Sequence, residues 1–129
     1  MIVTSDFARA AETAAAVAAA VRKPVSVSPK LRERVFGELE LGPDSRYAEV
    51  WAFDKDSADH TEFGVESISA VRSRATELVH ELDAMHDGAT IVLSAHGDTL
   101  QILQTAFLDI PVTSHRTVPH LKNCDLRWM

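Results

Sequence analysis

Two short apolar runs, each followed at once by polar residues and a helix-forming stretch, constrain the fold more than any other feature. The first is MIVTSD at 1–6 and the second is TIVLSAHGD at 90–98. An apolar run of this length is typical of a strand in a parallel sheet, where ligands bind at the carboxyl ends of the strands. Because both runs lead into helices, we expect the two junctions to open onto the same edge of one sheet.

Apolar periodicity and breaking residues predict the other elements. The predicted strands cover 1–4, 25–28, 90–95 and 123–129, and the predicted helices cover 6–22, 45–53, 66–86 and 98–108. Ser5 or Asp6 is placed to cap the first helix, which is rich in alanine, the best helix former. Asp98 and Gln101 have the spacing of a capping box for the last helix.

The alternation of strands and helices predicts an α/β fold, a three-layer sandwich with a mostly parallel central sheet. A length of 129 residues is ordinary for one domain, so we expect a single domain over 1–129. Between Lys30 and Gly64 no clean period holds. So long an irregular excursion in a compact domain is more often a functional cap than a plain connection.

Composition excludes several classes of protein. A formal net charge of −6 argues against broad binding to nucleic acid. No apolar run approaches the roughly 20 residues of a membrane span, and no secretion signal precedes the first strand, so we expect a cytoplasmic protein. The one cysteine, Cys124, has no partner for a disulfide and is expected to be a reduced core or strand residue. No histidine or acidic cluster has the spacing of a metal site.

Three residues could carry chemistry. Arg9 lies in the first helical turn, where a cation is unfavourable unless an anion binds there or Asp6 or Glu12 pairs with it. His96, at the end of a predicted strand, is either a satisfied core histidine or a functional one. Glu33, with an arginine on each side, is by itself better explained as a salt-bridged loop acid than as a proton donor.

Four fragments, in this order, resemble the histidine phosphatase superfamily, the phosphoglycerate-mutase-like proteins. They are TSDFARAAETA, LRERVFGELE, FGVESISAVRSRA and IVLSAHGDTLQIL, and they cover nearly the whole chain. The resemblance implies a phosphoglycerate-mutase-like fold and a hydrolase or mutase that uses a phosphohistidine and needs no cofactor or metal. It also implies phosphate or a phosphorylated small molecule as the partner.

The resemblance assigns roles to the three candidates. Arg9 matches the phosphate-binding arginine of the S-x-x-x-R-A pattern, and Glu33 matches the proton donor of L-R-E-R-x-F-G. His96 matches the second histidine, which lines the phosphate pocket and stabilises the transferring group. The predicted catalytic residues are therefore Glu33 and His96, the predicted phosphate ligands are Arg9 and His96, and 34–64 becomes the substrate-facing insertion. Asp98 replaces an asparagine of the glycolytic mutases, which favours a phosphatase.

One part of the family pattern is missing. Family members begin with a strand that ends in Arg-His-Gly and carries the nucleophilic histidine, and this chain contains no such tripeptide. The resemblance therefore implies a domain truncated at its N-terminus. Three hypotheses stay open: an inactive piece of a longer phosphatase, a non-catalytic protein that binds phosphorylated ligands or partners, and an enzyme with a rearranged histidine.

The missing strand also affects the expected architecture. It is central in the family, beside the strand at 90–95. We expect the order 25–28, 1–4, 90–95, with the C-terminal strand moving toward the vacant place or a second copy covering it, because an open strand edge exposes backbone donors. A homodimer is therefore predicted.

Overall fold

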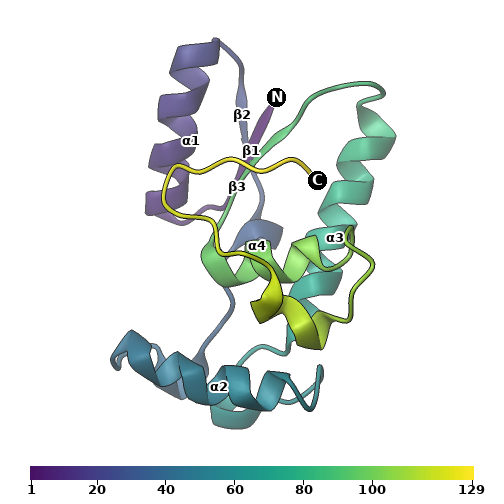
Figure 1. Ribbon diagram of the computed structural model, residues 1–129. Coiled ribbons are helices and arrows are strands. Elements are labelled where there is room, and N and C mark those ends of the chain that lie inside the picture. The colour runs from purple at the N-terminus through teal and green to yellow at the C-terminus, as the bar shows by residue number, and fades with distance from the viewer.

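The computed structural model describes residues 1–129 as an α/β fold built on a small parallel sheet (Figure 1). Its three strands are β1 (Ile2–Thr4), β2 (Val25–Val27) and β3 (Val92–Ser94). Their order is β2-β1-β3, and both pairings are parallel, so that Thr4 lies between Val27 and Ser94. The predicted strand order is confirmed.

Helices cover both faces of the sheet (Figure 1). The α-helices are α1 (Ala8–Val21), α2 (Tyr47–Asp54), α3 (Ile68–Met85) and α4 (Gly97–Gln104). On one face the hydroxyl of Ser94 donates a 3.0 Å hydrogen bond to the carbonyl of Ala10 in α1. On the other face Val3 packs with Leu78 and Leu82 of α3. The predicted three layers are therefore present, because side chains alternate between the two faces of each strand.

The excursion after β2 has its own small apolar cluster. It begins with short 3-10 turns and contains α2, which lies beyond the carboxyl end of the sheet in Figure 1. Its buried core residues are Phe36, Leu39, Val50 and Val65. The ring of Phe36 stacks on that of Tyr47 with centroids 3.8 Å apart. This apolar cluster faces the carboxyl ends of the strands (Figure 1).

The first helix begins later than predicted. Phe7 is the N-cap of α1 and makes no side-chain capping bond, so neither Ser5 nor Asp6 has the predicted role. Asp6 instead accepts a 2.8 Å hydrogen bond from Nε of Arg32. Such a charge-assisted pair is stronger than a bond to a neutral backbone N–H, which explains why Asp6 leaves the helix end.

The capping box expected at the start of the last helix is wrong. The N-cap of α4 is His96, and no side chain caps the helix. Gln101 donates instead to the carbonyl of Val118 at 2.6 Å. Asp98 is buried and turned toward donors from other segments, as described below. Tertiary partners have replaced the local bonds that the spacing favoured.

The predicted strand at 123–129 does not form. The chain makes a turn at Asn123 and Cys124, and Cys124 is exposed with a φ of 66°, so it is neither a core nor a strand residue. Arg127 holds the tail by donating to Gln104 at 2.8 Å and to the carbonyl of Pro119 at 2.7 Å. Bonds to a helix end have taken the place of strand pairing.

Strand β3 consequently keeps one free edge. It pairs with β1 alone, and its residues are half-buried rather than fully buried as their apolar character predicted. The association of two copies across this edge stays a prediction. None of the helices combines the length and the apolar character needed to cross a membrane.

Candidate functional site

A pocket of about 680 Å³ gathers residues from α1, from the loop after β2, from the excursion and from α3. Arg9 and Glu33, both predicted site residues, line it. Other lining residues include Phe7, Arg32, Phe36, Glu40, Tyr47 and Arg74. His96 borders the same region through Phe7, because their rings meet edge to face with centroids 5.3 Å apart. The three predicted residues are therefore brought together.

Arg9 is the cation of this pocket that is free to bind an anion. It is exposed in the first turn of α1 and forms no ion pair. Asp6, which the sequence offered as its partner, binds Arg32 instead. The guanidinium of Arg9 lies 5.4 Å from the centroid of the Phe7 ring. A cation at the positive end of a helix is electrostatically unfavourable, and a bound anion removes this unfavourable energy.

His96 is held by a serine from the first strand-to-helix junction. It is 5% exposed, and its Nε2 lies 3.0 Å from Oγ of Ser5. Burial, and after it the charges of Arg9 and Arg74, lower the pKa of His96 from 6.5 to about 4, while the charge of Asp6 opposes them. His96 is therefore a neutral imidazole at neutral pH. Ser5 thus joins the candidate site, and its place in the S-x-x-x-R-A pattern could have pointed to it.

Glu33 has one carboxyl oxygen engaged and one free. Oε1 accepts hydrogen bonds from the backbone N–H of Arg34 at 2.9 Å, and from the backbone N–H and hydroxyl of Thr99 at 3.3 and 3.2 Å. Oε2 makes no hydrogen bond. Burial is the largest influence on its pKa and raises it, the charge of Asp98 raises it further, and the three donors oppose the rise. The net effect favours the proton-bearing carboxyl.

Neither neighbouring arginine pairs with Glu33. The guanidinium of Arg32 binds Asp6, and that of Arg34 binds Asp54. The interpretation of Glu33 as a salt-bridged loop acid, which its neighbours favoured, is therefore wrong. Successive side chains of this irregular segment point in different directions, so Arg32 and Arg34 do not contact the carboxylate of Glu33 although they are its sequence neighbours.

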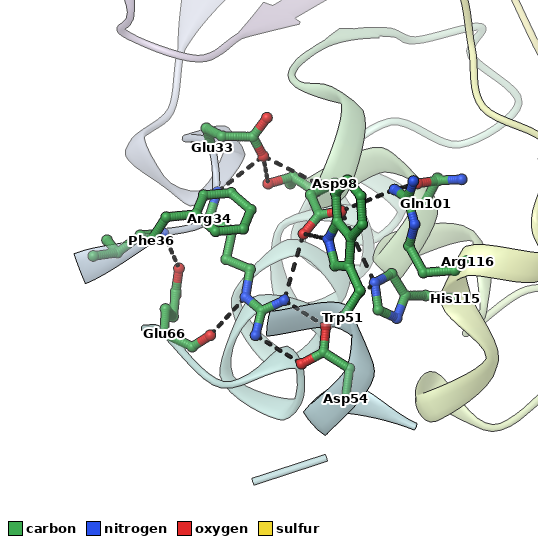
Figure 2. A network of polar contacts seen from close by, with 12 residues as sticks. Glu33, Arg34, Phe36, Trp51, Asp54, Glu66, Asp98, Gln101, His115 and Arg116 are labelled. Carbon is green, nitrogen blue, oxygen red and sulfur yellow. Dashed lines mark hydrogen bonds and ion pairs between the residues drawn. The ribbon is translucent and has the colours of Figure 1, made fainter. Parts of the chain in front are cut away.

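A buried polar network lies behind Glu33 (Figure 2). Arg34, whose side chain is fully buried, donates to both oxygens of Asp54, at 2.7 and 2.9 Å. Its Nη1 also lies 3.5 Å from Oδ2 of Asp98. Asp98 accepts further bonds from the indole of Trp51 and from Arg116, each at 3.3 Å. The network joins the excursion to the start of α4.

Two histidines that showed no ligand-like spacing meet at Asp54. Nε2 of His60 lies 2.6 Å from Oδ1, and Nε2 of His115 lies 3.6 Å from Oδ2. His115 donates from Nδ1 to the carbonyl of Val112 at 3.2 Å, while its Nε2 has no hydrogen-bond partner. Burial is the main cause of the lowered pKa of His115. No local sequence signal could have grouped these residues. The structure contains no group of three or more histidine, cysteine, aspartate or glutamate side chains that could hold a metal ion.

The site thus combines a free guanidinium, a neutral imidazole and a buried carboxyl with a raised pKa, at the carboxyl ends of parallel strands. Such a set suits anion binding and proton transfer. The fold and these motifs are those of the histidine phosphatases. The chain belongs to the histidine phosphatase superfamily (branch 1), whose family model matches residues 1–129.

Two relatives of known name are similar in sequence to this chain. Glucosyl-3-phosphoglycerate phosphatase of Mycolicibacterium vanbaalenii is 36% identical over 128 residues, which cover 87% of this chain and 55% of that protein. A protein of Yersinia enterocolitica named "Probable phosphoglycerate mutase GpmB" is 31% identical over 130 residues, covering 97% of this chain and 60% of that protein. The chain therefore spans little more than half the length of these relatives.

A solved structure shows the same likeness in space. The complex of mycobacterial glucosyl-3-phosphoglycerate phosphatase with inorganic phosphate matches with a TM-score of 0.82 and 28% identity, over 95% of this chain and 65% of that one. The same mycobacterial phosphatase has also been solved with VO3. The observed strand order and helix layers are thus those of histidine phosphatases.

Proposed function

We propose that this chain carries the phosphate-binding and proton-donating groups of a phosphomonoester hydrolase. The observation that carries the proposal is that Arg9 and Glu33 line one pocket and His96 lies beside it against Phe7, although the three come from different segments. A relative solved with inorganic phosphate supports an anion as the ligand. The relative named as a phosphatase supports hydrolysis over mutase activity.

Each group has a defined part in the proposed reaction. Arg9 and the N–H of His96 bind the phosphoryl oxygens and stabilise their developing charge. Oε2 of Glu33 gives its proton to the leaving oxygen as the P–O bond of the ester breaks. The phosphoryl group moves to an attacking imidazole nitrogen, and water later cleaves the P–N bond to release phosphate. The attacking imidazole must be distinct from His96, which serves the phosphoryl oxygens.

The 129 residues contain no Arg-His-Gly tripeptide to supply that imidazole. We expect no hydrolysis of an aryl phosphate by this chain, and hydrolysis by a version extended upstream to an in-frame Arg-His-Gly. The measurement is release of the phenolate, with His96→Ala in both lengths as the control. Activity of the 129 residues that His96→Ala abolishes would contradict the assignment and would favour a rearranged histidine.

Phosphate binding can be tested without turnover. Phosphate at ten times its Kd should stabilise the chain by about 1.4 kcal/mol, which raises Tm by about 5 °C for a domain of this size. Arg9→Ala should remove most of this increase, because Arg9 is the unpaired cation of the pocket. Arg72→Ala, an equal charge change outside the pocket lining, is the control and should keep it. Equal protection in both variants would remove Arg9 from the site.

A second candidate is a non-catalytic module that binds phosphorylated ligands through the same residues. The unpaired Arg9 at the pocket supports it, because anion binding needs no attacking imidazole. Phosphate protection that depends on Arg9, together with inactivity of both chain lengths, would distinguish this candidate from the hydrolase.

A further inference from the structure

Asp98 is a buried carboxylate near the pocket that does not line it. The residue is 5% exposed and stands in the first turn of α4. Donors reach it from three segments: Trp51 in α2, Arg116 after α4, and Arg34 next to Glu33. Arg116 also lies over the Trp51 ring, 3.6 Å from its centroid. A carboxylate with three donors is fixed in orientation.

The residue beside Asp98 is the one that holds Glu33. Thr99 is fully buried and donates to Oε1 of Glu33 from both its backbone N–H and its hydroxyl. The single proton of this hydroxyl also points to the carbonyl of Arg32 at 2.9 Å, so that carbonyl and Oε1 share it. Arg34 links Glu33 to the buried network, because its backbone N–H donates to Glu33 while its side chain binds Asp54 and Asp98. Figure 2 shows Glu33 beside Arg34 and Asp98.

The position of the free oxygen follows from this geometry. Two backbone N–H groups, those of Arg34 and Thr99, donate to Oε1, so a proton on the carboxyl resides on Oε2. Glu33 lines the pocket, and Oε2 is the oxygen left to act there. A proton donor needs this arrangement, in which one oxygen is anchored and the other is available.

Titratable and charged groups face Glu33 from every element that packs on it. They are Arg9 of α1, Arg32 and Arg34 of its own loop, Glu40 of the next turn, Tyr47 of α2, the Glu66–Arg74 pair, and Asp98 of α4. Within the buried network Arg34 and Arg116 face Asp54 and Asp98, with His60 and His115 beside them. Two cations thus balance two anions. Loss of one carboxylate would leave a positive excess behind Glu33.

We infer that Asp98 is a positioning residue for Glu33: its buried carboxylate fixes the start of α4 that holds Oε1, and its charge keeps the proton on Oε2. This inference rests on the proposed role of Glu33 as proton donor. The direction agrees with the raised pKa of Glu33, to which burial contributes most and Asp98 adds. Removing the charge of Asp98 should therefore make Glu33 more acidic.

The test is a pH titration of the Glu33 carboxyl carbon by NMR in the 129-residue chain, with the resonance assigned by its loss in Glu33→Gln. In Asp98→Asn the midpoint should shift to lower pH. Asp83→Asn removes the same charge from an exposed position of α3 and should leave the midpoint where it is in the wild type. An unchanged midpoint in folded Asp98→Asn would overturn the inference.

A second variant covers the case in which Asp98→Asn does not fold. Arg116 has a side chain 31% exposed, so Arg116→Gln is expected to fold. It removes a cation from Asp98, and the Glu33 midpoint should then shift to higher pH, opposite to Asp98→Asn. No shift would again overturn the inference. Absence of phosphate protection with the two shifts intact would overturn the proposed function alone.

Discussion

Asp54→Ala is expected to lower the free energy of unfolding by about 3 to 5 kcal/mol, the usual cost of removing one partner of a buried ion pair. The side chains of Asp54 and Arg34 are both fully buried, and two hydrogen bonds join them. Without Asp54 the guanidinium of Arg34 keeps only Asp98, at 3.5 Å, and a backbone carbonyl. His60 and His115 lose the same carboxylate.

This loss is a large part of the 5 to 15 kcal/mol that typically stabilises a domain. Urea denaturation followed by circular dichroism measures it, and the variant should unfold at a clearly lower midpoint. The control is Glu49→Ala, which breaks the Arg46–Glu49 pair, joined at 3.0 Å but with both side chains nearly half exposed. Because exposed pairs contribute little, its midpoint should stay close to that of the wild type. Similar losses in both variants would show that burial does not govern the effect.

Gly37→Ala is expected to destabilise the chain by about 2 to 5 kcal/mol, the sum of an unfavourable backbone conformation and a forced displacement. Gly37 has a φ of +54°, which residues with a Cβ rarely adopt. A Cβ there would lie 2.3 Å from the carbonyl oxygen of Phe63 and 2.5 Å from that of Gly64. These are backbone atoms, so no side-chain rotation can relieve the contact.

The matched control for Gly37 is Gly88→Ala. Gly88 has a φ of +64°, but no atom lies within 4 Å of the place where its Cβ would stand. Only the conformational part of the cost should remain, about 1 to 2 kcal/mol. Comparing the two denaturation midpoints therefore isolates the steric part. Equal losses would mean that the excursion moves to accommodate the added methyl group.

The site could be predicted in part because its motifs are local. Arg9 and His96 each lie at a strand-to-helix junction, and parallel strands bring such junctions to one edge of the sheet. The resemblance to histidine phosphatases supplied Glu33, whose own neighbours favoured a different interpretation. The bond that joins His96 to Ser5 spans 91 positions and was not predictable from spacing.

The buried network could not be predicted for the same reason. Arg34 and Asp54 are 20 positions apart, and Arg34 and Asp98 are 64 apart. Charged residues at such positions look like ordinary surface residues in a sequence, because nothing local marks them for burial. The wrong capping box at Asp98 follows from this, since local spacing favoured a bond that tertiary donors replaced.

The sequence by itself determined the order of strands and helices, the parallel sheet and the edge at which the candidate residues meet. These follow from hydrophobic periodicity and from helix and strand propensities, which act over a few residues. Only the tertiary structure decided the burial of Arg34 and Asp98, the anchored oxygen of Glu33, the exposed position of Cys124 and the free edge of β3. Those features depend on which distant segments pack together. The free energy of packing arises from contacts between segments, so no single segment determines it.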